Sequence, residues 1–336
     1  MLKILVTGCA GFIGSHLCEK LLEDGYSVVG IDNFDDFYSK TIKIDNMKGY
    51  INNPNFIFFE LDITKRLISK LPQNIDIVVH LAGKAGVLPS IDYSGDYLAS
   101  NVFGTHQVLE YMRNCNIKKL IFASSSSVYG NNKSIPFKET DNVDNPISPY
   151  AFTKKACELL NYTYHGLYNI DVINLRFFTV FGPRQRPDLA IHKFLKRILN
   201  DEQLILYGDG NSARDYTYIT DTISGISNAI YYCISKNKFF LTLNLGNNLP
   251  IKLIDMVRSL YKLTGRAENY IHESMQAGDV DITYADITLA KQVLDYFPKT
   301  SFNEGLLKFI FWFVNQNETP QPIICTSSAG LNNNYK

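Results

Sequence analysis

Short apolar runs alternate with longer amphipathic segments through the first half of the chain. The apolar runs are rich in Val, Ile and Phe and occupy residues 3–8, 27–32, 55–62, 76–82, 118–124 and 171–178. Most segments between them repeat apolar residues at helical spacing, as in GSHLCEKLLEDG (14–25) and NVFGTHQVLEYMRNCN (101–116). Alternating strands and helices predict an α/β fold with a doubly wound parallel sheet, and nearly continuous apolar strands fit a sheet that is covered on both faces.

Beyond about residue 180 this alternation weakens. Helical patterns at 188–201, 222–236, 253–265 and 302–316 are separated by short strands and turns. We therefore predict a large domain over 1–178 and a smaller mixed α/β C-terminal lobe, mainly over 179–316, with the chain free to recross between them. Residues 317–336 are polar, contain proline and lack periodicity, which predicts a disordered tail.

Three glycines follow the first predicted strand. The stretch ILVTGCAGFIGSHL places Gly8, Gly11 and Gly14 between that strand and the first helix. Glycine permits a tight turn and lets the backbone approach a pyrophosphate, which the helix N-terminus then binds. The alternative is that the glycines only close a tight turn.

An acid at the end of the second predicted strand supports the dinucleotide interpretation. Asp32 lies about twenty residues after the glycines, where a carboxylate binds the adenosine ribose diol. A carboxylate there would repel a 2′-phosphate and so favours NAD over NADP. Asp62 and Ile63, at the end of the third strand, are placed to meet the adenine; the alternative for Asp62 is a simple turn residue.

Two further motifs supply candidate chemistry. In NPISPYAFTKKACELL, Tyr150 and Lys154 are four residues apart and therefore share one face of a helix. A lysine ammonium and a positively charged nicotinamide both favour the phenolate form of a neighbouring tyrosine. In LIFASSSSVYG, four serines end an apolar strand, and strand alternation predicts that Ser125 and Ser127 point together to one site, with Ser124 and Ser126 pointing elsewhere.

Composition narrows the class of protein. The 336 residues are 46% hydrophobic and carry 33 acidic and 33 basic side chains, so no global field indicates nucleic acid or an anionic membrane as a partner. No apolar run is long enough to span a membrane. The six cysteines form no C-x-x-C pair and the six histidines show no metal-ligand spacing, which predicts reduced thiols, a cytoplasmic location and no metal site.

The set TGCAGFIG, HLAGKAG, ASSSSVYG and SPYAFTK resembles the extended short-chain dehydrogenase/reductase superfamily, within its nucleotide-sugar epimerases and dehydratases. The resemblance implies a Rossmann domain with tightly held NAD, a lobe that binds a UDP-sugar, and a homodimer formed through helices at about 92–114 and 150–168. It also implies that Tyr150 is the base, that Lys154 binds the nicotinamide ribose, and that Ser125 hydrogen-bonds the reacting hydroxyl; strand alternation adds Ser127 as a second catalytic hydroxyl. The cofactor site implied in this way comprises Gly8, Gly11, Phe12, Ile13, Gly14, Asp32, Asn33, Asp62, Ile63, Leu81, Ala82, Gly83, Lys84, Asn101, Tyr150, Lys154 and Phe177.

The serine row distinguishes between reactions within that group. Similar proteins that eliminate water carry an Asp–Glu pair before VYG, and those that decarboxylate a sugar acid carry a Glu there. Here the two positions are Ser126 and Ser127, and neither can act as a carboxylate. What remains is reversible oxidation at C4 of the sugar, with Tyr150 taking the hydroxyl proton and the hydride returning to the other face, which predicts a 4-epimerase.

A second stretch bears on the substrate. INLRFFTVFGPRQRPDLAIHKF resembles UDP-glucuronate 4-epimerases, and by position Thr179 and Arg186 would contact the sugar carboxylate, together with Ser125, Ser126 and Ser127 at the substrate. An Arg guanidinium also matches a carboxylate bidentately on physical grounds. The alternative for Arg186 is a diphosphate contact or a plain surface charge. LILYGDGNSARDYTYITD and MQAGDVDITYAD resemble nucleotide-contacting segments, which implies contacts from Arg214, Gln276 and Asp279.

One position departs from the pattern of the glucuronate epimerases. HLAGKAGVLPSI carries Leu88 where those proteins usually have Arg. A UDP-glucose or UDP-N-acetylglucosamine 4-epimerase is therefore the first alternative. A UDP-glucuronate decarboxylase or net oxidoreductase, and a non-catalytic nucleotide-binding module, are further alternatives.

Overall fold

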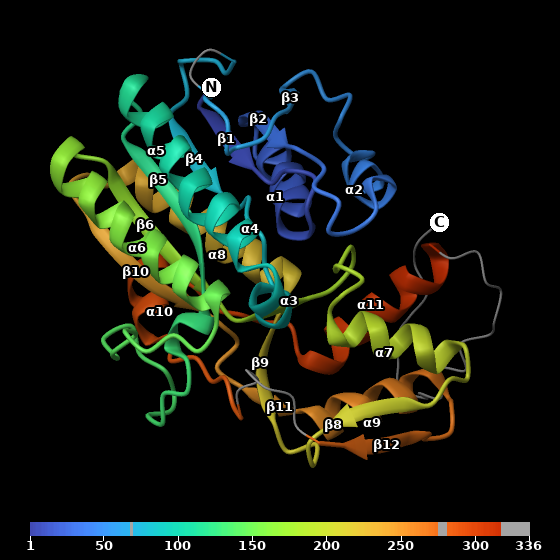
Figure 1. The fold of residues 1–336 in the computed structure, drawn as a ribbon. Helices are drawn as coiled ribbons and strands as arrows, with labels where there is room; N and C mark the ends of the chain where they lie inside the picture. Colours follow the sequence, from blue (N-terminus) through green and yellow to red (C-terminus); the bar gives the residue numbers. More distant parts are fainter. Residues whose placement is uncertain (68–69, 275–280, 317–336) are drawn as a thin grey trace.

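The computed structural model describes residues 1–67, 70–274 and 281–316. Its large sheet has seven strands in the order β10-β6-β5-β4-β1-β2-β3, and every neighbouring pair is parallel. The strands are β1 (Lys3–Thr7), β2 (Ser27–Asp32), β3 (Phe56–Glu60), β4 (Ile77–His80), β5 (Lys119–Ser125), β6 (Asp171–Phe177) and β10 (Phe240–Leu245). The predicted α/β class with a doubly wound parallel sheet is confirmed (Figure 1).

Helices cover both faces of this sheet (Figure 1). One set comprises α3 (Val87–Asp92), α4 (Ser94–Tyr97), a π-helical turn (Leu98–Phe103), α5 (Gly104–Asn114) and α6 (Pro149–Tyr168). On the other face lie α1 (Phe12–Glu23) and α8 (Ile219–Ser235). Alternate strand residues divide accordingly: Ile4 and Val6 pack with α1 and α8, whereas Leu5 packs with α5 and α6.

A smaller lobe carries short sheets and the remaining C-terminal helices. A three-stranded mixed sheet is formed by β7 (Thr179–Phe181), β9 (Ala213–Tyr218) and β11 (Pro250–Lys252), and a two-stranded parallel sheet by β8 (Leu204–Tyr207) and β12 (Tyr270–Glu273). Its helices are α7 (Ala190–Leu199), α9 (Leu253–Thr264) and α11 (Phe302–Gln316), while α10 (Thr288–Leu294) packs near β10. Strand β10 returns the chain to the large sheet from beyond residue 178, so the proposed domain boundary stays a prediction.

The strand order of the large sheet sets the position of the site. The chain builds β1, β2 and β3 outward in one direction and then adds β4 on the other side of β1, so the strand order reverses between β1 and β4. In open parallel sheets, ligands bind at the carboxyl ends of the strands at such a point.

No helix among the described residues is long and apolar enough to cross a bilayer. The predicted tail, 317–336, lies outside the described residues.

Candidate active site

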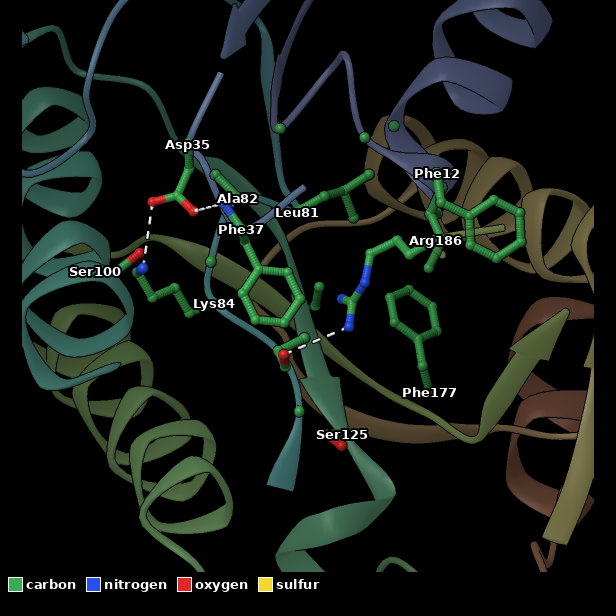
Figure 2. Close-up of a pocket in the computed structure, with 18 of the residues that line it drawn as sticks. Phe12, Asp35, Phe37, Leu81, Ala82, Lys84, Ser100, Ser125, Phe177 and Arg186 are labelled. Atoms are coloured by element: carbon green, nitrogen blue, oxygen red, sulfur yellow. Dashed lines mark hydrogen bonds and ion pairs between the residues drawn. The ribbon is translucent and has the colours of Figure 1, made fainter. Parts of the chain in front are cut away.

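A cleft of about 480 Å³ opens at the carboxyl ends of β1, β2, β4 and β5. Its walls come from the loops after these strands, from the first turns of α6 and from the segment 177–189 (Figure 2). Most residues predicted for a cofactor or substrate line it. They are Gly8, Gly11, Phe12, Ile13, Gly14, Asp32, Asn33, Asp62, Ile63, Leu81, Ala82, Gly83, Lys84, Ser125, Ser126, Ser127, Tyr150, Lys154, Phe177, Thr179 and Arg186.

The glycine-rich turn fits a dinucleotide pyrophosphate. Gly8 has φ +73°, and a Cβ on Gly14 would lie 2.0 Å from the Gly8 carbonyl oxygen, so the turn and the helix pack too closely for side chains. Gly11 caps α1 without any side chain that bonds the first-turn amides. Those N–H groups and the helix dipole therefore face an open part of the cleft, which is the arrangement that binds a phosphate.

Asp32 occupies the position expected for a ribose-binding acid. Its two carboxylate oxygens accept the backbone N–H of Ala10 at 3.1 Å and of Phe34 at 2.9 Å, which fixes the orientation of the carboxylate. Burial raises the pKa of this carboxyl, an effect opposed by the Phe34 amide and the Lys43 ammonium. Asp62 closes the third strand's loop by accepting the Thr64 N–H at 2.8 Å and also lines the cleft.

Asn101 lies behind the cleft wall and not on it. The residue sits in the π-helical turn and is 2% exposed. Its side chain accepts the Lys84 N–H at 2.7 Å and donates to the Lys84 carbonyl at 2.9 Å and to the Thr153 hydroxyl at 3.0 Å. π-Helical turns often occur at functional sites. Here the turn directs the Asn101 side-chain amide toward the backbone of Lys84, so Asn101 fixes the position of the loop that forms this wall of the cleft.

A buried histidine is linked by hydrogen bonds to the same loop. His80 Nδ1 lies 2.7 Å from the Thr7 hydroxyl and Nε2 lies 3.0 Å from the Thr105 hydroxyl, and Thr7 in turn accepts the Ala82 N–H at 3.1 Å. Desolvation and then the nearby Lys154 ammonium lower the pKa of His80 to about 3. The ring is therefore neutral at physiological pH and acts as a hydrogen-bonding spacer between β1 and α5.

The four serines do not divide into two pairs by strand alternation. Strand β5 ends at Ser125, and Ser126–Tyr129 form a 3₁₀ turn. That turn brings the hydroxyls of Ser125 and Ser127 to 3.1 Å, as predicted, and Ser125 also accepts the Ser127 N–H at 3.1 Å. Ser126 belongs to the cleft lining, as Ser124 does, so the lining does not separate the two pairs that strand alternation predicts.

Ser124 has a different role from its neighbours. Its hydroxyl donates to Glu158 of α6 at 2.5 Å, and Glu158 is bound bidentately by Arg176 of β6 at 2.9 and 2.8 Å. Arg176 also donates to the Tyr129 hydroxyl at 3.0 Å. All of these groups are buried. This network ties the end of β5, the 3₁₀ turn and α6 together, and thereby fixes Ser125 relative to the helix that carries Tyr150.

Tyr150 and Lys154 begin the helix opposite the serines. Ser148 caps α6 by accepting the Ala151 N–H at 3.1 Å, with a proline at the first helical position. Lys154 is 5% exposed, donates to the Ala123 carbonyl at 2.8 Å and lies 6.0 Å from the centroid of the Tyr150 ring. The lysine thus joins the tyrosine helix to the serine strand.

Arg186 reaches the cleft from the smaller lobe, but it already has a carboxylate partner. Asp188 accepts hydrogen bonds from its Nε at 2.9 Å and from its Nη2 at 2.7 Å. Nη2 also lies 3.4 Å from the Ala85 carbonyl oxygen. Asp188 is not among the residues predicted from the sequence. Thr179, at the start of β7, lines the same end of the cleft.

Three predicted substrate contacts lie apart from this cleft or outside the described residues. Arg214, on β9, is absent from the lining and donates to the Ala213 carbonyl at 3.0 Å. Gln276 and Asp279 lie outside the described residues. Leu88 is 44% exposed and follows Val87, which does line the cleft.

The loop between β2 and α2 (Lys40–Met47) contributes residues that the sequence analysis missed. Asp35, Phe37 and Tyr38 line the cleft, as does Lys43 of α2. Their position directly after Asp32 was the available signal, since a loop that follows a ribose-binding acid must pass the cofactor.

Comparison with known proteins places this site in a family. The model of the NAD dependent epimerase/dehydratase family matches residues 4–238. The chain is 40% identical to the UDP-glucuronate 4-epimerase of Thermodesulfobacterium geofontis, covering 92% of this chain and 95% of that protein. It is also 40% identical to protein CapI of Staphylococcus aureus, covering 93% and 98%.

Solved structures agree with this. The UDP-glucuronic acid 4-epimerase of Bacillus cereus, in complex with UDP-glucuronic acid and NAD, is similar with a TM-score of 0.88 at 38% identity, covering 94% of this chain and 100% of that one. The UDP-glucose 4-epimerase of Thermotoga maritima, with UDP-glucose, has a TM-score of 0.85 at 31% identity, covering 94% and 100%. With its glycine turn, its acid after β2 and its tyrosine–lysine helix, the chain belongs to the NAD dependent epimerase/dehydratase family, and NAD is its cofactor.

Proposed function

We propose that this protein is a UDP-glucuronate 4-epimerase that interconverts UDP-glucuronate and UDP-galacturonate. NAD, when bound, accepts a hydride from a carbinol carbon and returns it. The glycine turn and Asp32 would hold it at the pyrophosphate and adenosine ribose. Tyr150 would take and return the proton of the sugar 4-hydroxyl through its phenolic oxygen, while Ser125 and Ser127 hold that hydroxyl by hydrogen bonds.

The distribution of carboxylates in the cleft carries this proposal. Among the described lining residues the carboxylates are Asp32, Asp35 and Asp62, all at or after β2 and β3. Strand β5, with the serines, lies on the other side of β1. A dehydratase needs acid and base groups beside the sugar, and here the described lining near Tyr150 offers hydroxyls instead. This favours moving a hydride out and back.

Product analysis with purified protein tests the proposal. The protein is incubated with a panel of UDP-sugars and the products are identified by NMR. UDP-galacturonate formed from UDP-glucuronate, without a pentose product, is the expected outcome. Release of CO₂ or accumulation of NADH would instead support a decarboxylase or net oxidoreductase.

Arg186 supports an acidic substrate. Its guanidinium and Thr179 line the end of the cleft that faces the smaller lobe. We expect Arg186→Ala to lower kcat/KM for UDP-glucuronate about a hundredfold and for UDP-glucose much less, since a bidentate charged contact is worth about 2–3 kcal/mol. Steady-state kinetics on both sugars measure this, and equal losses would remove the assignment of Arg186 to the carboxylate.

A second candidate, a UDP-glucose or UDP-N-acetylglucosamine 4-epimerase, is favoured by one observation. Asp188 already engages two nitrogens of Arg186, so the pair carries no net charge toward a substrate anion. Leu88 offers no compensating cation. Turnover of a neutral UDP-sugar well above that of UDP-glucuronate in the same NMR panel would establish this candidate instead.

We propose in addition that the protein forms a homodimer. Helix α6 exposes Phe152, Leu159 and Tyr162 at 49%, 57% and 61%, and the neighbouring π-helical turn exposes Phe103 at 49%. A face this apolar is typical of an interface between subunits. Leu159→Glu should convert a dimer to a monomer in sedimentation analysis, and an unchanged mass would contradict this face.

A reducing compartment such as the cytoplasm is the location that we propose. The cysteines among the described residues, Cys9, Cys18, Cys115, Cys157 and Cys233, are all free thiols. Burial raises the pKa of each of these thiols, which keeps them in the unreactive protonated form. Maleimide labelling of protein taken directly from cells measures the fraction of free thiols, and a large oxidised fraction would contradict the proposal.

A further inference from the structure

Asp35 joins three segments around the cofactor pocket. One carboxylate oxygen accepts the Phe37 N–H at 3.0 Å, and the other lies 3.4 Å from the Lys84 ammonium. The main-chain carbonyl of Asp35 accepts a hydrogen bond from Lys43 at 2.5 Å. The loop between β2 and α2 is therefore held at its middle by one residue (Figure 2).

The ion pair between Asp35 and Lys84 joins two loops that follow strands on opposite sides of β1. Asp35 follows β2, whereas Lys84 follows β4, and β1 lies between these two strands in the sheet. The loop after β1 carries the glycines that fit the pyrophosphate. Both side chains line the same cleft as those glycines, so the pair connects the two walls of the pocket on either side of β1.

The same loop also contacts the smaller lobe. The guanidinium of Arg186 lies 5.3 Å from the centroid of the Phe37 ring, within the range of a cation–π contact. In Figure 2, Phe37 lies between Lys84 and Arg186. The loop thus has one attachment beyond β1 and a second on the segment after β7.

We infer that Asp35, Phe37, Lys84 and Arg186 form a clasp across the cofactor pocket that slows release of NAD. The side chains of Asp35 and Lys84 are 31% and 20% exposed, so their attraction is only partly screened by water. NAD leaves the pocket only after these cross-cleft contacts open. The inference rests on NAD binding in this cleft and holds for any sugar, so its test is independent of the proposed substrate.

A double-mutant cycle on the release rate tests the clasp. The holoprotein is loaded with NADH and chased with excess NAD, and the loss of fluorescence from bound nicotinamide gives the release rate. Asp35→Asn and Lys84→Met should each speed release about threefold, as expected for a partly exposed ion pair. The double variant should be no faster than the faster single variant, because both remove one contact. Unchanged rates in both single variants, or rates that multiply in the double variant, would overturn the clasp.

A neighbouring acid provides the matched control. Asp96 of α4 lies 3.7 Å from the same Lys84 ammonium, but α4 follows β4, so this pair does not cross the pocket. Asp96→Asn should release NADH at the wild-type rate. Lys84→Arg keeps the positive charge that Lys84→Met removes, so it should also release NADH at the wild-type rate. A threefold increase in Asp96→Asn would overturn the clasp, because it would mean that the net charge around Lys84, and not the crossing contact, controls release.

The contact between Phe37 and Arg186 is tested separately. Phe37→Leu keeps an apolar side chain but loses the ring that Arg186 contacts, and we expect release to accelerate by about threefold. The thermal midpoint of the NAD-free protein reports whether the fold itself is altered. A wild-type release rate in Phe37→Leu would remove Arg186 from the clasp and so overturn the inference in this form.

Discussion

On the cofactor side of the cleft the groups that fit the pyrophosphate come from backbone, with the Asp32 carboxylate added for the ribose, whereas on the substrate side the contacts come from side chains. Gly8, Gly11 and the uncapped amides of α1 present peptide groups that no substitution alters without moving the chain. Across the cleft, Ser125, Tyr150 and Arg186 present hydroxyls and a guanidinium from three separate elements. The backbone groups of the glycine turn are needed for binding any dinucleotide. The side chains on the substrate side can differ between enzymes that act on different sugars.

The two sides are also held in different ways. Local turns and a glycine–glycine contact shape the cofactor side. On the substrate side, side-chain contacts fix the groups: Lys154 to the Ala123 carbonyl and Ser124 to Glu158 are long-range, whereas Arg186 pairs with Asp188 two positions along the chain. Substitutions on the first side should therefore act on the backbone and on cofactor binding together, and those on the second side should act on the choice of substrate.

The largest effect should follow from adding one methyl group on the cofactor side. In Gly14→Ala the new Cβ would lie 2.0 Å from the Gly8 carbonyl oxygen, so backbone must move. We expect a loss of about 3 kcal/mol in the free energy of unfolding and loss of NAD binding. Chemical denaturation and NAD titration measure these. Gly166→Ala in α6, where the Cβ meets open space, is the control and should stabilise by up to about 1 kcal/mol. Similar behaviour of both variants would contradict the close-packing argument.

An intermediate effect should come from the buried histidine beneath the wall. The folded-state pKa of His80 is about 3, far below the value of about 6.5 in the unfolded chain, so the unfolded state gains protons first as pH falls. Stability from neutral His80 is complete above pH 6.5 and declines below it. Between pH 7 and pH 5 the wild type should lose about 2 kcal/mol more than His80→Gln, as measured by denaturant unfolding at each pH. Parallel pH profiles would show that His80 is not the group responsible.

The smallest effect should be confined to substrate choice. Thr179→Val removes a hydroxyl from the substrate side while conserving shape, so we expect kcat/KM for UDP-glucuronate to fall about fivefold and that for UDP-glucose to stay constant. Thr222→Val, buried in α8 away from the cleft, should leave the ratio of the two unchanged. A shift of the ratio in Thr222→Val, or none in Thr179→Val, would break the proposed division between the two sides.

The same division explains what could be predicted from the sequence. The six N-terminal strands, the glycine turn and Asp32 were predictable because each depends on residues close together in the chain. The pairing of Arg186 with Asp188 was not, because a charged residue two positions away has no fixed direction until the loop is folded. Strand β10 was also missed as a member of the large sheet, since its pairing with β6 joins residues about seventy positions apart. The Ser125–Ser127 contact was predicted for the wrong reason, because a 3₁₀ turn and not a strand produces it.

The π-helical turn at Leu98–Phe103 leads directly into α5, and the number of residues in this turn determines how the residues before it are oriented relative to α5. Such a turn contains one residue more than an α-helix needs, so a single-residue deletion there would leave a well-bonded α-helix. It would also rotate everything before the turn by about 100° relative to α5. Thr105 would still reach His80, but Asn101 would no longer face Lys84. Insertions and deletions that a surface helix normally absorbs should therefore be excluded here, and natural variation of this segment should proceed by substitution alone.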